Sequence, residues 1–202
     1  MNLRSRSLQD LLDDLAGRTP VPGGGTVAGI IAALATSLGR MVLAFTQGKQ
    51  AFAEYDEVNE RSVAFLTAAS DEALELAEAD AAAYERLNTL WKLPDDDPQR
   101  DAGWDGAVEG AIDAPLRTMA LCQRMLTAIA ELRPRTSRML ASDLVIAAIL
   151  AAAAARAASC NVATNLPHLR SEAKRASLSA QSKELLAACN ELAEQVESTP
   201  PV

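Results

Sequence analysis

One aspartate, Asp80, lies in an otherwise apolar stripe of what we expect to be the longest helix of this chain. The stripe has spacings of four and three residues, which is helical periodicity. Burial there would raise the pKa of the carboxyl group and let it carry a proton near neutral pH. The alternative is a structural aspartate paired with an arginine across the core, and the pattern admits both roles. The stripe consists of Ala73, Ala77, Asp80, Tyr84, Leu87 and Trp91.

A turn rich in proline and glycine is the second place where chemistry is expected. It leads into an apolar segment, so it delivers the chain to a helix N-terminus, where free N–H groups and the helix dipole attract anions or polarised oxygens. Glycines allow a ligand to approach the backbone closely. No strand precedes the turn, which excludes a P-loop or a Rossmann fingerprint. A tight connection between helices is the alternative. The turn contains Pro22, Gly23, Gly24, Gly25 and Thr26.

Four further polar residues have patterns that suit a binding site. Asn161 and Asn165 are one helical turn apart, and they could hold a heterocycle or cap the end of their helix. Asp143 fits the first turn of the same helix. Lys49 follows Gly48, which we expect to end a helix, so it could bind an anion, although a lysine is favourable there in any case.

The remaining reactive residues exclude several classes of site. His168 is the only histidine, just past a predicted helix end, and we expect it to be an exposed loop residue. With no cysteine cluster beside it, we expect no metal site and no Ser-His-Asp triad. Cys122, Cys160 and Cys189 are far apart and odd in number, which suits small buried side chains in a reducing compartment.

The net charge and the N-terminal segment of the chain allow expectations about its partners and its cellular location. The net charge is −8 and no lysine or arginine cluster is present, so we expect no binding to nucleic acid. The segment Met1–Asp14 mixes arginines with aspartates and has no apolar stretch of the kind found in secretory signals. The expected location is therefore the cytoplasm.

The composition predicts an all-α fold. Apolar residues make up 49% of the chain, with much alanine and only 3% aromatic residues, and no strand alternation is visible. We expect residues 1–202 to form one domain, a bundle of about five to six helices with long central ones. The first predicted helix is short, with Ser7 as its N-cap, and ends at Gly17. The other predicted helices span Gly25–Thr46, Phe52–Trp91, Trp104–Leu132, Ser137–Asn165 and Arg170–Val196. We predict an acidic loop over Lys92–Gly103 and expect Pro115 to start or kink the fourth helix.

Two apolar segments require comparison with membrane spans. Val27–Phe45 and Leu144–Cys160 are interrupted by Arg40 and Arg156, and neither offers 18 uncharged apolar residues. We therefore predict buried core helices and no membrane partner. An alanine-rich core buries less apolar area per residue than a leucine core, so we expect a homodimer or a larger homo-oligomer.

Several of these motifs occur in an order that resembles the cyclodeaminase/cyclohydrolase family of folate enzymes. This family includes the cyclodeaminase half of formiminotransferase-cyclodeaminase and stand-alone methenyltetrahydrofolate cyclohydrolases. The resemblance covers roughly residues 7–170, and the turn with three glycines is its most specific part. It rests on Thr19–Thr26, Thr46–Lys49, Asp80–Tyr84, Lys92–Pro94, Ala114–Leu116, Ser142-Asp143, Asn161-Val162 and Asn165-Leu166.

The resemblance implies a dimerising all-helical fold with a folate pocket near the glycine turn. It implies a tetrahydrofolate derivative as substrate, no tightly bound cofactor, and Asp80 as the acid/base residue. It also implies that the residues of the turn, Lys49, Asp143, Asn161 and Asn165 bind the substrate. One departure is that Ala163 and Thr164 stand where the family often has a basic residue and an aliphatic one.

Two reactions are compatible with this resemblance. In the cyclodeaminase reaction, N10 of 5-formiminotetrahydrofolate attacks the formimino carbon and ammonia leaves, which requires a proton donor. In the cyclohydrolase reaction, water adds to the methenyl carbon and the ring opens to 10-formyltetrahydrofolate, which requires a base. A non-catalytic helical oligomer that binds folate or a protein partner is the alternative. The aspartate in an apolar stripe favours an enzyme, whereas Ala163 favours the alternative.

Overall fold

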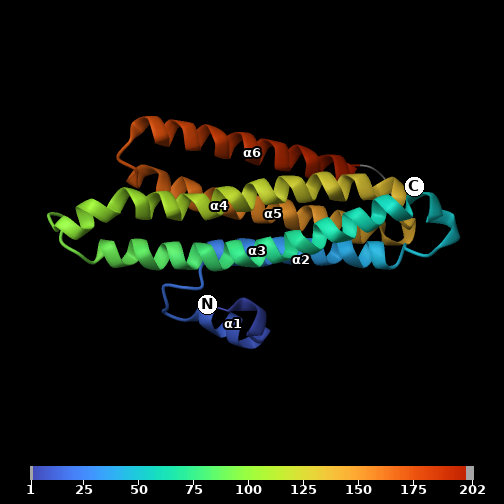
Figure 1. Ribbon diagram of the computed structural model, residues 1–202, viewed down its shortest axis with the longest axis horizontal. Helices are drawn as coiled ribbons and strands as arrows, with labels where there is room; N and C mark the ends of the chain where they lie inside the picture. The colour runs from blue at the N-terminus through green and yellow to red at the C-terminus, as the bar shows by residue number, and fades with distance from the viewer. Residues whose placement is uncertain (1, 199–202) are drawn as a thin grey trace.

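Four long helices form the body of the molecule, with consecutive helices running in opposite directions (Figure 1). They are α2 (Gly24–Ala44), α3 (Asp56–Trp91), α4 (Pro98–Leu132) and α5 (Ala141–Asn165). Helix α2 packs mainly on α3 and α5, α4 also packs on both, and α6 (Glu172–Ser198) covers α4 and α5. This is a computed structural model that describes residues 2–198, so Met1 and residues 199–202 of the predicted domain lie outside the described residues. Within residues 2–198 there are six α-helices and no strand, which confirms the predicted all-α fold.

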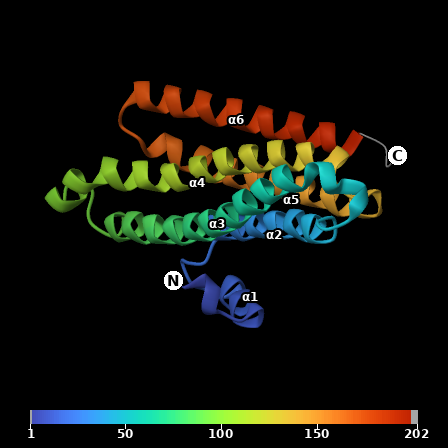
Figure 2. The same ribbon diagram turned by 45° about the vertical axis from the view of Figure 1, so that its right-hand side comes forward.

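The first helix stands apart from this body. Helix α1 (Leu8–Ala16) projects from the bundle in both views (Figures 1 and 2) and has no buried residue. Ser7 caps it as predicted, because the Ser7 hydroxyl oxygen accepts a hydrogen bond of 3.1 Å from the backbone N–H of Asp10. The residues that precede α1 attach it to α3. The backbone N–H of Leu3 donates to Glu78 at 2.7 Å, and Arg4 forms an ion pair with Asp71 at 2.7 Å.

Helix α4 begins earlier than predicted. Asp97 accepts hydrogen bonds from the N–H groups of Gln99 and Arg100, and Pro98 occupies the first helical position. An aspartate cap followed by proline is a strong helix start, so the second half of the predicted acidic loop over Lys92–Gly103, from Pro98 onward, is helical and that part of the prediction is wrong. Pro115 consequently lies well inside α4, where it is buried. The ends of the other predicted helices differ from the observed ends by at most four residues.

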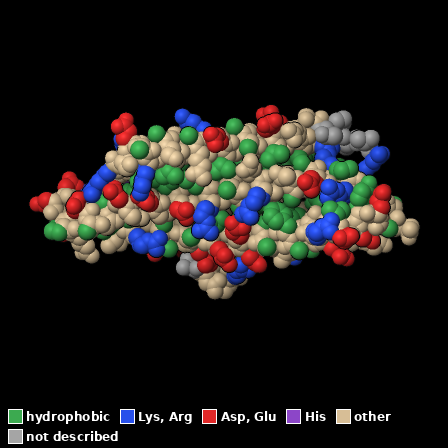
Figure 3. Space-filling model, turned by 45° about the horizontal axis from the view of Figure 1, so that its top comes forward, with side chains coloured by type: hydrophobic (Ala, Val, Ile, Leu, Met, Phe, Trp, Pro, Cys, Tyr) green, Lys and Arg blue, Asp and Glu red, His purple; other side chains and the backbone are tan. Residues whose placement is uncertain are grey.

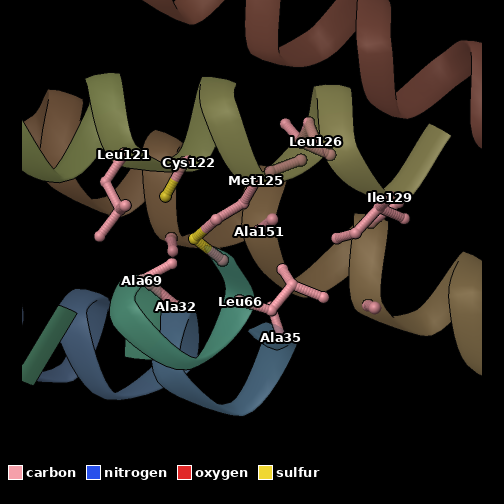
Figure 4. Close-up of a cluster of buried hydrophobic side chains, with 14 of the residues drawn as sticks. Ala32, Ala35, Leu66, Ala69, Leu121, Cys122, Met125, Leu126, Ile129 and Ala151 are labelled. Atoms are coloured by element: carbon pink, nitrogen blue, oxygen red, sulfur yellow. The ribbon is translucent and has the colours of Figure 1, made fainter. Parts of the chain in front are cut away.

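Alanines allow the central helices to approach closely, and larger side chains from α3 and α4 fill the remaining space. Buried Cys122 and Cys189 behave as the predicted small hydrophobic side chains, whereas Cys160 is exposed. Figure 4 shows Leu66, Leu121, Met125, Leu126 and Ile129 packed among the alanines Ala32, Ala35, Ala69 and Ala151.

Helix α2 approaches α3 closely at Gly29, and this contact allows a test of the packing. A methyl group there would lie 2.6 Å from Cβ of Ala77 and 2.7 Å from the carbonyl oxygen of Ala73. We expect Gly29→Ala to lower the free energy of unfolding by about 1–3 kcal/mol in urea denaturation, because overpacking outweighs the better helix propensity of alanine. Gly106→Ala in α4 is the control, since nothing lies within 4 Å of its added methyl group. Equal effects of the two substitutions would contradict this packing.

The prediction that the two apolar segments are buried core helices holds for only part of each helix. By length and composition alone, α2 and the stretch Arg138–His168 could cross a membrane, a test that core helices of soluble proteins also pass. Only 50% and 39% of their most apolar windows are buried. On α2, half-buried or exposed apolar residues form one line, here called the α2 stripe. It consists of Val27, Ile30, Ile31, Leu34, Leu38, Met41 and Phe45.

Charges of both signs are interspersed on the face shown in Figure 3, without a large patch of one sign. Several are paired between helices, such as Arg124 with Glu72 at 2.8 Å and Arg170 with Asp101 at 2.7 Å. These exposed pairs contribute little to stability individually.

Candidate functional site

A cavity of about 260 Å³ lies where α2 begins, enclosed by the preceding loop and by α3, α4 and α5. It brings together predicted site residues from three distant parts of the sequence. A larger hollow of about 580 Å³ between α4 and α6 is lined by none of the predicted site residues. The residues lining the smaller cavity are Pro20, Val21, Gly23, Gly24, Gly25, Asp80, Tyr84, Ala111, Asn161 and Asn165.

Asp80 reaches this cavity because Gly25 has no side chain. Helix α3 places the carboxyl group directly against the first turn of α2, and a Cβ atom on residue 25 would lie 2.2 Å from Cγ of Asp80. The backbone N–H groups in that turn have no partner within the helix, since the N–H of Val27 is the first to bond back, to Gly23 at 3.0 Å. The site therefore combines a carboxyl group with a helix N-terminus.

The carboxyl group of Asp80 is half-buried, and this burial raises its pKa to about 6. The shift has the direction predicted from its place in the stripe. No ion pair or hydrogen bond involves Asp80 among residues 2–198, so the structure does not contain the arginine partner of the structural alternative. A group with this pKa exists in both protonation states near neutral pH, which suits either a proton donor or a base.

Tyr84 was predicted to be buried in the same stripe, and this is wrong. Ala73, Ala77 and Leu87 are buried as expected, but Tyr84 is 41% exposed and lines the cavity. Helix α2 begins opposite Asp80 and runs away from Tyr84, so no helix covers the tyrosine ring. Sequence periodicity finds the inward face of α3 but contains no signal for where the neighbouring helix starts.

Asn165 has a specific structural role in addition to lining the cavity. Pro115 has no N–H group, so the carbonyl oxygen of Ala111, four residues earlier, lacks its helical partner. The amide nitrogen of Asn165 donates to that oxygen at 3.0 Å. The asparagine thus joins the end of α5 to the middle of α4 rather than capping its own helix.

Asn161 has an unused donor in the same cavity. Its side-chain nitrogen is buried and has no hydrogen-bond partner within residues 2–198. The Oδ1 atom lies 3.7 Å from the position a Cβ atom on Gly24 would take. Because an unpaired buried amide is costly, this arrangement favours a ligand or water that accepts the hydrogen bond.

Other predicted binding residues do not line the cavity. Pro22 and Thr26 are buried in the turn and shape it, with a cis peptide bond between Val21 and Pro22. Lys49 lies beyond the far end of α2, whose 21 residues extend over about 30 Å from the glycine turn. Asp143 lies in the first turn of α5 at that same end, where the N–H of Ser137 donates to Thr46 at 3.4 Å. One chain by itself cannot bring Lys49 or Asp143 to Asp80.

His168 also differs from the prediction of an exposed loop residue. It is half-buried and packs edge-to-face against Trp91, with ring centres 5.2 Å apart. The indole nitrogen of Trp104 donates to its carbonyl oxygen at 2.9 Å. No group of three potential metal ligands is found in the part of the chain that the structure describes.

Comparison with known proteins identifies relatives of the whole bundle. The family model for formiminotransferase-cyclodeaminase matches residues 7–184. The formimidoyltransferase-cyclodeaminase of Rattus norvegicus is 32% identical over 151 residues, which cover 73% of this chain and 28% of that protein. The methenyltetrahydrofolate cyclohydrolase of Methylorubrum extorquens is 28% identical over 203 residues, covering 96% of both chains.

A solved structure extends this similarity to three dimensions. The formiminotetrahydrofolate cyclodeaminase of Thermotoga maritima superimposes with a TM-score of 0.90 at 26% sequence identity, over 97% of this chain and 96% of that one. The match thus spans less than a third of the length of the rat protein, but nearly all of the solved cyclodeaminase and of the bacterial cyclohydrolase.

Proposed function

Because the chain belongs to the formiminotransferase-cyclodeaminase family, we propose that it is an enzyme of folate one-carbon metabolism. It acts on the formimino or methenyl carbon of a tetrahydrofolate derivative, as formimidoyltetrahydrofolate cyclodeaminase or as methenyltetrahydrofolate cyclohydrolase. The observation that carries this proposal is Asp80, whose pKa is raised to about 6 in a cavity that also contains the unpaired amide of Asn161.

The cavity offers the groups that both reactions need. In the cyclodeaminase reaction, N10 attacks the formimino carbon, and the acid form of Asp80 gives its proton to the nitrogen that leaves as ammonia. In the cyclohydrolase reaction, the ionised form of Asp80 takes a proton from the water that adds to the methenyl carbon. A positioned proton carrier of this kind contributes about 10²–10⁴-fold in rate. The Asn161 amide and the N–H groups at the start of α2 orient polar atoms of the substrate.

Separate incubation with the two substrates tests this function. Formation of the methenyl chromophore from 5-formiminotetrahydrofolate identifies a cyclodeaminase. Loss of the chromophore from 5,10-methenyltetrahydrofolate, faster than without protein, identifies a cyclohydrolase. Turnover of neither substrate would favour the non-catalytic helical oligomer instead.

The pKa of Asp80 predicts opposite pH profiles for the two reactions. For the cyclodeaminase reaction we expect kcat/KM to fall as the pH rises through about 6, because the proton donor becomes ionised. For the cyclohydrolase reaction we expect kcat/KM to fall as the pH drops through about 6, because the base becomes protonated. Both profiles are measured after subtraction of the uncatalysed rate. An inflection that persists in Asp80→Asn would assign the titration to another group.

We also propose that the protein forms a homodimer or larger homo-oligomer through the α2 stripe. Leu34 and Phe45 in this stripe are 53% and 59% exposed, and Ile146 and Ile149 on the neighbouring α5 are 46% and 44% exposed. A line of partly exposed apolar side chains along one helix, such as the α2 stripe, is typical of association sites. Sedimentation at micromolar concentration should show a species of at least twice 21.3 kDa, and the 21.3 kDa species alone would contradict pairing.

The proposed location is the cytoplasm, where thiols stay reduced. It is supported by three free cysteines without a disulfide. The proposed ligand is the folate substrate alone, with no tightly bound cofactor and no nucleic-acid partner.

A further inference from the structure

We propose that Tyr84 binds the p-aminobenzoyl ring of the substrate by stacking, with the pterin enclosed in the inner part of the cavity and the glutamate tail leaving past the tyrosine. The inference rests on the proposed function for the identity of the ligand as a folate. Tyr84 is then a binding residue, and its position fixes the direction in which the folate lies.

The cavity has two levels along α3, one helical turn apart. At the inner level, Asp80 and Asn161 face the first turn of α2. At the outer level, Tyr84 and Asn165 follow them by four residues each, which is about 6 Å along a helix axis. Helix α2 begins at the inner level and runs the other way, which leaves Tyr84 41% exposed. The outer level is therefore the mouth of the cavity.

The hydrogen-bonding groups without a partner lie at the inner level. They are the side-chain nitrogen of Asn161 and the free backbone N–H groups at the start of α2. At the outer level, the amide nitrogen of Asn165 already donates to Ala111 at 3.0 Å, so Tyr84 and Ala111 give this level an apolar surface. The inner level therefore suits a polar heterocycle, and the outer level suits an apolar ring.

A tetrahydrofolate offers one ring system of each kind. The pterin carries several nitrogen atoms and a carbonyl oxygen along its edge, whereas the p-aminobenzoyl group presents an apolar aromatic ring. The carbon that reacts lies between N5 of the pterin and N10, and N10 is bonded directly to the p-aminobenzoyl ring. With this carbon beside Asp80 and the pterin inside, the p-aminobenzoyl ring lies outward, next to Tyr84.

The size of the cavity agrees with this direction. Its volume of about 260 Å³ is below the roughly 300–1,000 Å³ of sites that enclose a whole drug-sized ligand. The cavity therefore encloses one ring system, and the remainder of the folate extends through the mouth. No lysine or arginine lines the cavity, so the glutamate carboxylates are better placed outside it, in water.

The ring of Tyr84 is available for this contact. No hydrogen bond and no ring–ring contact of its side chain is found within residues 2–198. An aromatic ring of the ligand stacked on it, with ring centres about 4.5–7 Å apart, would remove apolar surface of both rings from water.

Two substitutions of Tyr84 test the stacking. Tyr84→Leu removes the ring from an exposed position, so we expect KM to rise at least about 10-fold while kcat changes by less than about 3-fold. Tyr84→Phe loses only the hydroxyl group, and both constants should stay within about 2-fold of the wild type. Tyr55→Leu, at the start of α3 and outside the cavity, is the matched control and should leave both constants unchanged.

Two results of these kinetics would overturn the stacking. An unchanged KM of Tyr84→Leu would show that the ring does not bind the substrate. A fall in kcat of Tyr84→Phe as large as that of Asp80→Asn would make the tyrosine hydroxyl a catalytic group instead. Thermal unfolding followed by circular dichroism should give the same midpoint for Tyr84→Leu and the wild type, because the ring is not part of the core.

Binding without turnover tests the direction of the substrate. Calorimetry under anaerobic conditions compares tetrahydrofolate with 6-methyltetrahydropterin, which has the pterin but neither the p-aminobenzoyl ring nor the tail. Tyr84→Leu should weaken the binding of tetrahydrofolate at least about 10-fold and leave that of the pterin unchanged, because only the former reaches the outer level. Weaker binding of the pterin to Tyr84→Leu, or no binding of the pterin to the wild type at millimolar concentration, would overturn the proposed direction.

The two experiments together separate this contact from the proposed function. A wild type that turns over neither substrate, yet binds tetrahydrofolate more tightly than Tyr84→Leu does, would keep the role of Tyr84 and reject the catalysis. Equal turnover and equal KM of the wild type and Tyr84→Leu would keep the proposed function and reject the role of Tyr84.

Discussion

Asp80→Asn is expected to lower kcat by about 10²-fold or more while folate affinity changes little. Asparagine has nearly the shape of aspartate and can still hydrogen bond, but it cannot exchange a proton at neutral pH. Since Asp80 has no bonded partner among the described residues, its replacement should leave the surrounding contacts intact. Steady-state kinetics on both substrates, with folate binding measured by calorimetry, would check this.

The same substitution should stabilise the protein at pH 8. The folded-state pKa of about 6 lies above the ordinary value of 3.8, so the ionised carboxylate is disfavoured in the folded state. This cost is absent below about pH 4, grows as the pH rises through 6, and is complete above it. Asparagine removes it, and we expect a gain on the order of 1–2 kcal/mol after allowance for solvent screening.

A surface carboxylate provides the control for both effects. Asp113→Asn on α4 removes an exposed group that is 3.5 Å from Arg117, and it should change neither turnover nor stability appreciably. Near-normal turnover of Asp80→Asn on both substrates would remove Asp80 from the mechanism. The non-catalytic alternative would then be favoured.

Gly25→Ala should reduce turnover to a similar extent, by about 10²-fold, by displacing the carboxyl group rather than removing it. The added methyl group would lie 2.2 Å from Cγ of Asp80, so either the aspartate must rotate away or α2 must shift. Alanine is a good helix former, so the helical circular dichroism should survive. Kinetics combined with circular dichroism on the purified variant would separate a displaced acid from an unfolded chain.

Gly24→Ala is the matched control in the neighbouring position. Its methyl group would lie 3.7 Å from Oδ1 of Asn161, an ordinary van der Waals distance, and nothing else is nearer. Because Gly24 itself lines the cavity, we expect this variant to raise KM, while kcat should stay far above that of Gly25→Ala. Equal impairment of both variants would mean that the loss comes from reduced backbone flexibility of the turn. Full activity of both variants would mean that the contact between residue 25 and Asp80 does not affect turnover.

The sequence alone determined the helices and the chemical groups of the site. Alanine-rich composition and 3.6-residue periodicity identify the helices, because backbone hydrogen bonding is local and does not depend on distant contacts. The cap at Ser7 follows from the same local rules, and the overlooked start at Asp97 and Pro98 could have been found by them. Asp80 was likewise detectable from the sequence, because the apolar stripe that contains this carboxylate lies within one continuous segment.

Only the tertiary structure decided how these groups meet. The exposure of Tyr84 depends on where α2 begins, and the bond from Asn165 to Ala111 depends on a carbonyl that Pro115 leaves unpaired on another helix. Likewise, periodicity on one helix cannot show that Lys49 and Asp143 lie at the end of the bundle opposite Asp80. Direction and stagger of neighbouring helices are set by side-chain packing between segments far apart in sequence, and no local pattern encodes that packing.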